Sequence, residues 1–187
     1  DQFHLPRPNE FIAEDVALVS LAGEHQAQPT VALARDRQKI WFMQDHEFRV
    51  PKGATYINFR SPEVGQDARQ AASALLYTAL LKDDVNEFAY SAMLAGLSFD
   101  FYKHAQGISL RVTGYNDKQP VLLQKLLAVA ANPAFDPARF DNIRKDMIRA
   151  LQNHVAASPS SQAMNDLREA VMYGEWGEQA LIAELEQ

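Results

Sequence analysis

The stretch over residues 86–120 constrains the fold most, because its hydrophobic pattern changes from a helical period to a strict alternation. Apolar residues recur at helical spacing as far as Gly96, and glycine often ends a helix because it adopts the left-handed C-cap conformation without steric cost. Apolar and polar residues then alternate over 99–102 and over 108–113, and Gly107 interrupts them. The pattern predicts a helix followed by a β-hairpin with one apolar face.

Alternation assigns Phe99 and Phe101 to that apolar face, so we expect both rings to be buried. The next segment, GYNDKQP, supplies turn residues, and Asn116 or Asp117 is expected to cap a helix over 121–131. Pro120 suits the first turn of that helix, where a missing N–H costs nothing. Helix, hairpin and helix predict the fold class α+β, an antiparallel sheet packed against helices.

The flanking sequence predicts more elements of both kinds. Extended segments are expected over 16–21, 31–34, 39–43, 48–50 and 54–60, and they predict antiparallel pairing. Helices are expected from Asp67 through an alanine-rich stripe, from Asp136 and Pro137, after the SPSS segment, and over 176–185. Residues 1–15 resemble a linker in which only Phe11 and Ile12 are suited to dock. Because neither end has the features of a finished terminus, we expect a piece of a longer chain.

Composition excludes several classes of function. The 187 residues suit one domain, and a net charge of -6 with interspersed signs argues against nucleic acid as a partner. No apolar run approaches the roughly 20 residues that cross a bilayer, so we expect a soluble chain that does not enter a membrane. Cysteine is absent, which excludes disulfides and thiolate chemistry.

No catalytic or metal-ligating constellation is visible. The five histidines are far apart, and the glycines form no phosphate-binding loop. The best local cluster is Asp45, His46 and Glu47, but neighbours on an extended strand point to alternate faces, so a solvated loop explains them better. Among the aromatic residues of the hairpin, Tyr102 is the one expected to be available for contact.

Several phrases closely resemble a known family: LPRPNEFIAEDV, KIWFMQDHEFRVPKG, INFRSPE, LLKDDVNEFAYSAMLAGLSFD and GISLRVTGYNDKQPVLL. They are similar to the third, middle domain of the pitrilysin (insulinase) family of zinc metallopeptidases. The resemblance implies four homologous α+β domains in two bowl-like halves that close on a peptide. It also implies a zinc site in the first domain, on an HxxEH motif and a downstream glutamate. The corresponding helix here, near 70–82, reads QAASALLYTALLK and has neither histidine nor glutamate.

The resemblance therefore implies no catalytic residue, no metal ligand and no cofactor in this chain, with zinc held elsewhere in the parent. Residues expected to touch substrate or other domains are Tyr102, Tyr115, Asn116, Asp117 and Lys118. The first hypothesis is a linker between enzyme halves (1–15) and a non-catalytic middle domain (16–187) that walls the substrate chamber. Its partners would be the other domains and a peptide substrate.

Two other hypotheses remain open at this point. One is a stand-alone binding or assembly module that kept the fold without protease activity. The other is an independent hydrolase that uses the loop of Asp45, His46 and Glu47. Oligomeric state and compartment stay open, and a periplasmic location is suggested only by bacterial relatives.

Overall fold

The structure is a computed structural model that describes residues 8–23, 27–153 and 156–187. Within them, three strands form one antiparallel sheet and two more form a separate hairpin. The strands are β1 (Thr30–Arg35), β2 (Gln38–Phe42), β3 (Lys52–Arg60), β4 (Ser98–His104) and β5 (Gly107–Tyr115). The helices are α1 (Ala68–Asp84), α2 (Asn86–Leu94), α3 (Gln119–Ala131), α4 (Pro137–Asn153), α5 (Pro159–Val171) and α6 (Glu178–Leu185). Short 3-10 turns are η1 (Pro62–Gly65) and η2 (Asn116–Lys118). The predicted α+β class is confirmed.

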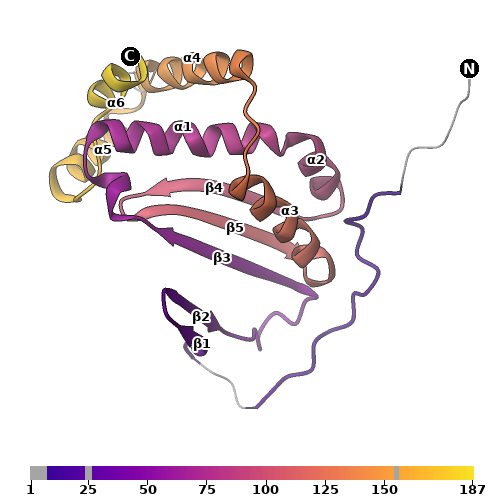
Figure 1. Cartoon of the computed structure of the whole chain (residues 1–187). Helices are drawn as coiled ribbons and strands as arrows, with labels where there is room; N and C mark the ends of the chain where they lie inside the picture. The colour runs from indigo at the N-terminus through magenta and orange to yellow at the C-terminus, as the bar shows by residue number, and fades with distance from the viewer. Residues whose placement is uncertain (1–7, 24–26, 154–155) are drawn as a thin grey trace, which may run out of the picture.

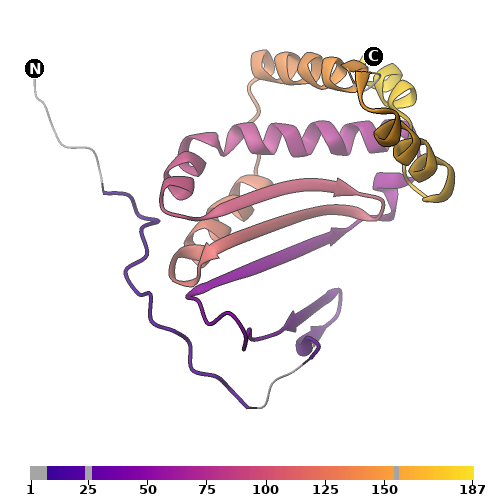
Figure 2. The same cartoon turned by 180° about the vertical axis from the view of Figure 1, so that it is seen from behind.

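Helices cover one face of the three-stranded sheet, whose strand order is β3-β5-β4. α1 packs on β4 and α3 on β5, and α4 and α6 form a further layer on α1 (Figure 1). Seen from behind, the opposite face of the sheet has no helix in front of it among the described elements (Figure 2). The sheet therefore has one face turned to the core and one face free of helices.

The largest buried cluster lies between the sheet, α1 and α3. Register places Ile57, Leu110 and Phe101 side by side on the three strands, and Phe101 is only 1% exposed. Phe99, two residues nearer the start of the edge strand, is half-buried, so the expectation of full burial is wrong for this ring. It lies edge-on against Phe101, with 6.0 Å between ring centroids. Phe99 covers the neighbouring ring and is itself left partly open.

Side-chain caps fix the starts of α1, α4 and α5. Asp67 accepts a hydrogen bond from the backbone N–H of Gln70 (2.7 Å) at α1, and Asp136 accepts one from Ala138 (2.8 Å) at α4. Ser158 does the same for α5. Gly96 follows α2 with φ +80, the conformation predicted for it. The cap predicted for α3 is wrong: Asn116 and Asp117 form η2, and the N-cap position belongs to Lys118 without a side-chain bond.

Two predicted strands are also absent from the described residues, because side chains take the backbone groups that a strand would pair. Over 16–21, Asp15 accepts from the N–H of Ala17 (2.8 Å), and Gln44 donates to the carbonyl of Ser20 (2.8 Å). Over 48–50, Asp45 accepts from the N–H of Phe48. Such local side-chain bonds compete with sheet ladders. Of the described helices, none combines the length and apolarity that crossing a bilayer requires.

Candidate functional site

The five residues expected to make contacts fall into two neighbouring places. Tyr102 and Tyr115 belong to β4 and β5, on the sheet face without helices, whereas Asn116, Asp117 and Lys118 form η2 at the end of β5. The β3–β5 pairing reaches the start of η2, where the N–H of Asn116 donates to the carbonyl of Pro51 (3.1 Å). The candidate site therefore consists of a sheet face and the turn at one end of it.

Polar and aromatic side chains make up that sheet face. Alternation along the strands follows from the register, in which Tyr102 pairs with Ser109 and Ser109 pairs with Asn58. The hydroxyl of Ser109 donates to the side-chain oxygen of Asn58, and the hydroxyls of Ser98 and Thr113 lie 2.6 Å apart. Cross-strand bonds of this kind hold the polar groups in fixed positions.

Larger side chains stand among these polar groups. Tyr56 is 59% exposed and pairs with Arg111, which pairs with Asp100 on β4. The ammonium of Lys52 lies 5.0 Å from the centroid of the Tyr115 ring, within range of a cation–π contact. Sequence reasoning missed Tyr56 and Arg111, although the alternation with Ile57 and Phe59 would have placed Tyr56 on this face. The face offers aromatic rings, hydroxyls, an amide and a guanidinium to a ligand.

At η2 the predicted residues hold the N-terminal segment of the chain itself. Asp117 Oδ2 accepts hydrogen bonds from the backbone N–H groups of Glu14 (2.9 Å) and Asp15 (3.3 Å). The ammonium of Lys118 lies 3.2 Å from the carboxylate of Glu14. These backbone hydrogen bonds lower the pKa of Asp117, and the hydrogen bond to Glu14 raises the pKa of Lys118. Both groups are therefore held in their charged forms at neutral pH.

A second anchor holds the segment a few residues earlier. Phe11 is 1% exposed, and its ring centroid lies 6.4 Å from that of Phe88 on α2. Lys125 on α3 sits over both rings and makes an ion pair with Glu10 (2.6 Å). Asn9 donates to the carbonyl of Ser91 (2.7 Å). The predicted docking of Phe11 is confirmed, whereas Ile12 is 57% exposed.

We expect the hydrogen bonds at Asp117 to weaken in acid. Because the docked state lowers the pKa of this carboxyl, its contribution is present above the ordinary aspartate pKa of about 4 and is lost as pH falls through the lowered value. NMR titration should show the amide proton shifts of Glu14 and Asp15 following a transition below that ordinary value. Asp117→Asn should abolish this transition. A transition at or above the ordinary aspartate pKa would contradict the assignment.

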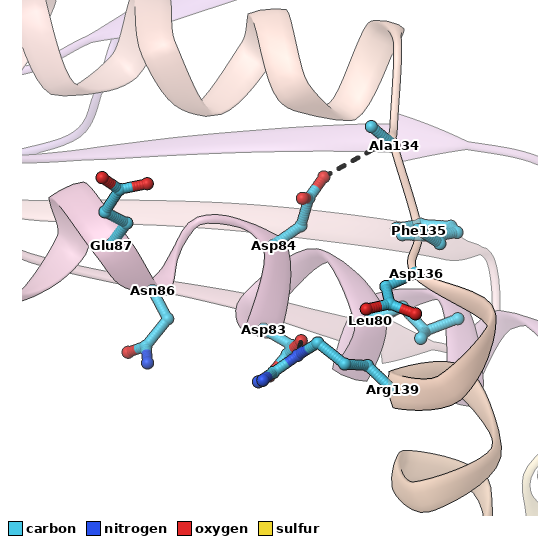
Figure 3. A pocket seen from close by; sticks show the side chains of 9 residues that line it. All are labelled: Leu80, Asp83, Asp84, Asn86, Glu87, Ala134, Phe135, Asp136 and Arg139. Atoms are coloured by element: carbon cyan, nitrogen blue, oxygen red, sulfur yellow. Dashed lines mark hydrogen bonds and ion pairs between the residues drawn. The ribbon is translucent and has the colours of Figure 1, made fainter.

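A pocket lies elsewhere, at the junction of α1, α2 and the start of α4, with a volume of about 340 Å³ (Figure 3). Its carboxylates serve packing: Asp83 makes an ion pair with Arg139 across the two helices, and Asp84 lies 3.4 Å from the backbone nitrogen of Ala134. The hydrogen bond from Arg139 lowers the pKa of Asp83. These contacts tie α4 and the segment before it to the end of α1.

The residues described do not fit a zinc site. No group of three or more His, Asp or Glu in 8–23, 27–153 or 156–187 could hold a metal ion. α1 is the helix compared above with the HxxEH helix of the family. It turns alanines, leucines and Thr78 to the interior, and none of these side chains is a usual zinc ligand. Asp45 is engaged with the backbone of Glu47 and Phe48. His4, His25 and His154 lie outside the described residues.

The family model described as "Middle or third domain of peptidase_M16" matches residues 1–184 of this sequence. The chain belongs to the peptidase M16 family. Insulin-degrading enzyme of Bos taurus is 42% identical over 169 residues, which cover 89% of this chain and 16% of that protein. A-factor-processing enzyme of Saccharomyces cerevisiae is 31% identical over 164 residues, 86% of this chain and 16% of that one.

The crystal structure of pitrilysin supports the same fold. Its TM-score is 0.78 at 17% identity, and the match covers 98% of this chain and 21% of that one. The resemblance to the middle domain of the pitrilysin family is thus confirmed. The chain spans 16% of the length of the mammalian insulin-degrading enzymes that it matches.

Proposed function

We propose that this chain is a non-catalytic middle domain of a zinc-dependent metalloendopeptidase and that its polar sheet face forms part of the wall of the substrate chamber. The membership of the family supports the first part. The sheet face supports the second, because it is the one broad surface of the described core that no helix covers (Figure 2). In this proposal the zinc and its HxxEH motif belong to another domain of the parent.

The chemistry of the face suits an extended peptide. A peptide presents alternating N–H and C=O groups, and the face supplies donors and acceptors of both kinds in Ser98, Thr113, Asn58 and Arg111. The rings of Tyr56 and Tyr102 add contact area with few rotatable bonds to immobilise. Moderate, sequence-tolerant contacts of this kind hold a substrate without doing chemistry on it.

We further propose that residues 1–15 are the end of the linker between the enzyme halves and that the anchors at Phe11 and Asp117 fix it to the middle domain. The supporting observation is that eight side chains from α2, α3, η2 and the segment itself take part in the docking. A linker anchored in this way would leave the middle domain at a defined point and in a defined direction. The rest of the parent would then be positioned relative to the sheet face.

Substitution of Tyr102 in the full-length parent tests the chamber-wall proposal. Tyr102→Ala should raise KM for a long peptide by about 3- to 10-fold and leave kcat within about 2-fold, because the ring contributes binding and no chemistry. Tyr90→Ala is the matched control, because it removes the same type of side chain from a surface position outside the sheet face. Tyr90 is 59% exposed and lies on α2. Unchanged KM for Tyr102→Ala, or equal effects of both variants, would contradict the proposal.

A further inference from the structure

Arg111 stands at the centre of the sheet face without helices. It lies midway along β5, the middle strand, and the register places Tyr56 on one side of it and Asp100 on the other. Side chains paired in this way point to the same face of an antiparallel sheet. Arg111 is exposed, and among residues 8–23, 27–153 and 156–187 its guanidinium has no ion pair or hydrogen bond.

The carboxylate that lies beside Arg111 in the register is already paired with another cation. Asp100 Oδ1 lies 2.7 Å from the ammonium of Lys82, which belongs to the last turn of α1. The side chain of Asp100 is therefore held by the helical layer rather than by its cross-strand neighbour. As a result, the positive charge of Arg111 is left without an anion on this face.

The sign of the charge on this face is opposite to that of the whole chain. Among the residues that β3, β4 and β5 place on it, Lys52, Arg60 and Arg111 are cationic and Asp100 is the single carboxylate, whereas the chain has a net charge of -6. Lys52 lies over an aromatic ring, and the guanidinium of Arg60 donates to the side-chain oxygen of Gln106 (3.0 Å). Of these three cations, Arg111 is the one left for a ligand.

The groups around Arg111 supply donors rather than acceptors. The side-chain oxygen of Asn58 accepts from the hydroxyl of Ser109, which leaves the amide NH₂ of Asn58 to donate elsewhere. Tyr56, directly opposite Arg111, is 59% exposed and can offer its hydroxyl as well. A guanidinium and an amide NH₂ donate only, so an anion with acceptor oxygens complements them. The anionic group that peptides carry is the carboxylate.

We propose that Arg111 binds a carboxylate of the peptide substrate, so that the parent peptidase favours peptides with an acidic group in the part that lies on this face. The inference rests on the proposed function, in which the face lines the substrate chamber. A guanidinium presents paired N–H groups that match the two oxygens of a carboxylate, and the charge adds to the hydrogen bonds. The carboxylate belongs either to a Glu or Asp side chain or to the C-terminus of the peptide.

Paired peptides cleaved by the full-length parent test this preference. Each pair is one long peptide with Glu or Gln at a single position, and the position is moved along the peptide outside the scissile bond. A further pair has a free or an amidated C-terminus. Where the charge reaches Arg111, we expect KM to be about 3- to 10-fold lower for the charged peptide, with kcat within about 2-fold. No difference in any pair would overturn the proposal.

Variants show whether Arg111 carries the preference. Arg111→Gln should raise KM of the charged peptide to that of the neutral one, and unchanged cleavage of the neutral peptide shows that the variant is folded. Arg111→Lys keeps the charge but loses the paired N–H groups, so it should retain part of the preference. The pair that responds, side chain or C-terminus, identifies the source of the carboxylate. An equal rise in KM for charged and neutral peptides would contradict a carboxylate site.

Arg60→Gln is the matched control. It removes the same charge from the same face, at a residue whose guanidinium is bonded to Gln106. We expect the preference for the charged peptide to remain in this variant. A loss of preference equal to that in Arg111→Gln would assign the effect to the charge of the face as a whole and would overturn the proposal.

The outcomes also separate this inference from the proposed function. If Tyr102→Ala raises KM for both members of every pair while Arg111→Gln leaves any preference unchanged, the chamber wall stands and the carboxylate site is refuted. If Tyr102→Ala and Arg111→Gln both behave like the unsubstituted parent, the face does not meet substrate and both proposals fail.

Discussion

Phe101→Ala is expected to lower the free energy of unfolding of the domain by about 3 to 5 kcal/mol, the usual cost of removing a fully buried aromatic ring. The ring is 1% exposed, lies opposite the fully buried Leu110 and belongs to the largest buried cluster. Because the surrounding strands are tied by hydrogen bonds, the cavity cannot collapse easily. Urea denaturation of the purified chain, followed by tryptophan fluorescence and far-UV circular dichroism, measures the loss.

Phe99→Ala is the matched control for this prediction. It removes the same ring two residues away on the same strand and the same face, but from a half-buried position. We expect about half the loss or less, since part of the ring already contacts water. Equal losses for the two variants would show that the register of β4 against β5 is wrong.

Phe11→Ala should release the N-terminal segment from the domain. Phe11 is 1% exposed and packs on Phe88 under the ammonium of Lys125, so its removal should cost about 3 kcal/mol of docking free energy. Amides from Phe11 to Asp15 should then exchange roughly 100-fold faster, since 1.4 kcal/mol corresponds to a factor of ten. Hydrogen exchange with mass spectrometry on the segment measures this effect.

Ile12→Ala provides the comparison within the same segment. Ile12 is 57% exposed, and its truncation should change exchange by no more than a few-fold. In the full-length parent, Phe11→Ala should also lower activity if the anchored linker positions the enzyme halves. Exchange in the segment that is unchanged by Phe11→Ala would contradict the anchor.

The α+β core was predictable because its signals are local. Caps at Asp67, Asp136 and Ser158 satisfy N–H groups a few residues away, and Gly96 needs only its own backbone freedom. The alternation around Phe101 also depends on neighbours in sequence. The strand predicted over 16–21 does not form, because Gln44, more than twenty residues away, donates to the carbonyl of Ser20. The hydrophobic periodicity of the sequence carries no information about such a bond.

At the candidate site, too, local features could be predicted from the sequence and contacts between distant segments could not. The residue types of Asn116 to Lys118 identified the turn. They did not show that Asp117 accepts hydrogen bonds from the backbone N–H groups of Glu14 and Asp15, which lie more than a hundred residues away. Lys125 was missed because a single lysine in a helix carries no signal until Glu10 is placed beside it. Contacts between segments distant in sequence need the fold before they can be inferred.

Metal analysis combined with a peptide-cleavage assay, on this chain and on its full-length parent, tests the central claim most directly. We predict no stoichiometric zinc and no hydrolysis for the chain alone, and one zinc with hydrolysis for a parent that carries HxxEH in another domain. A native gene product that ends near these 187 residues and lacks HxxEH would favour a stand-alone module instead. Stoichiometric zinc held by this chain's own side chains, together with peptide cleavage, would contradict the account.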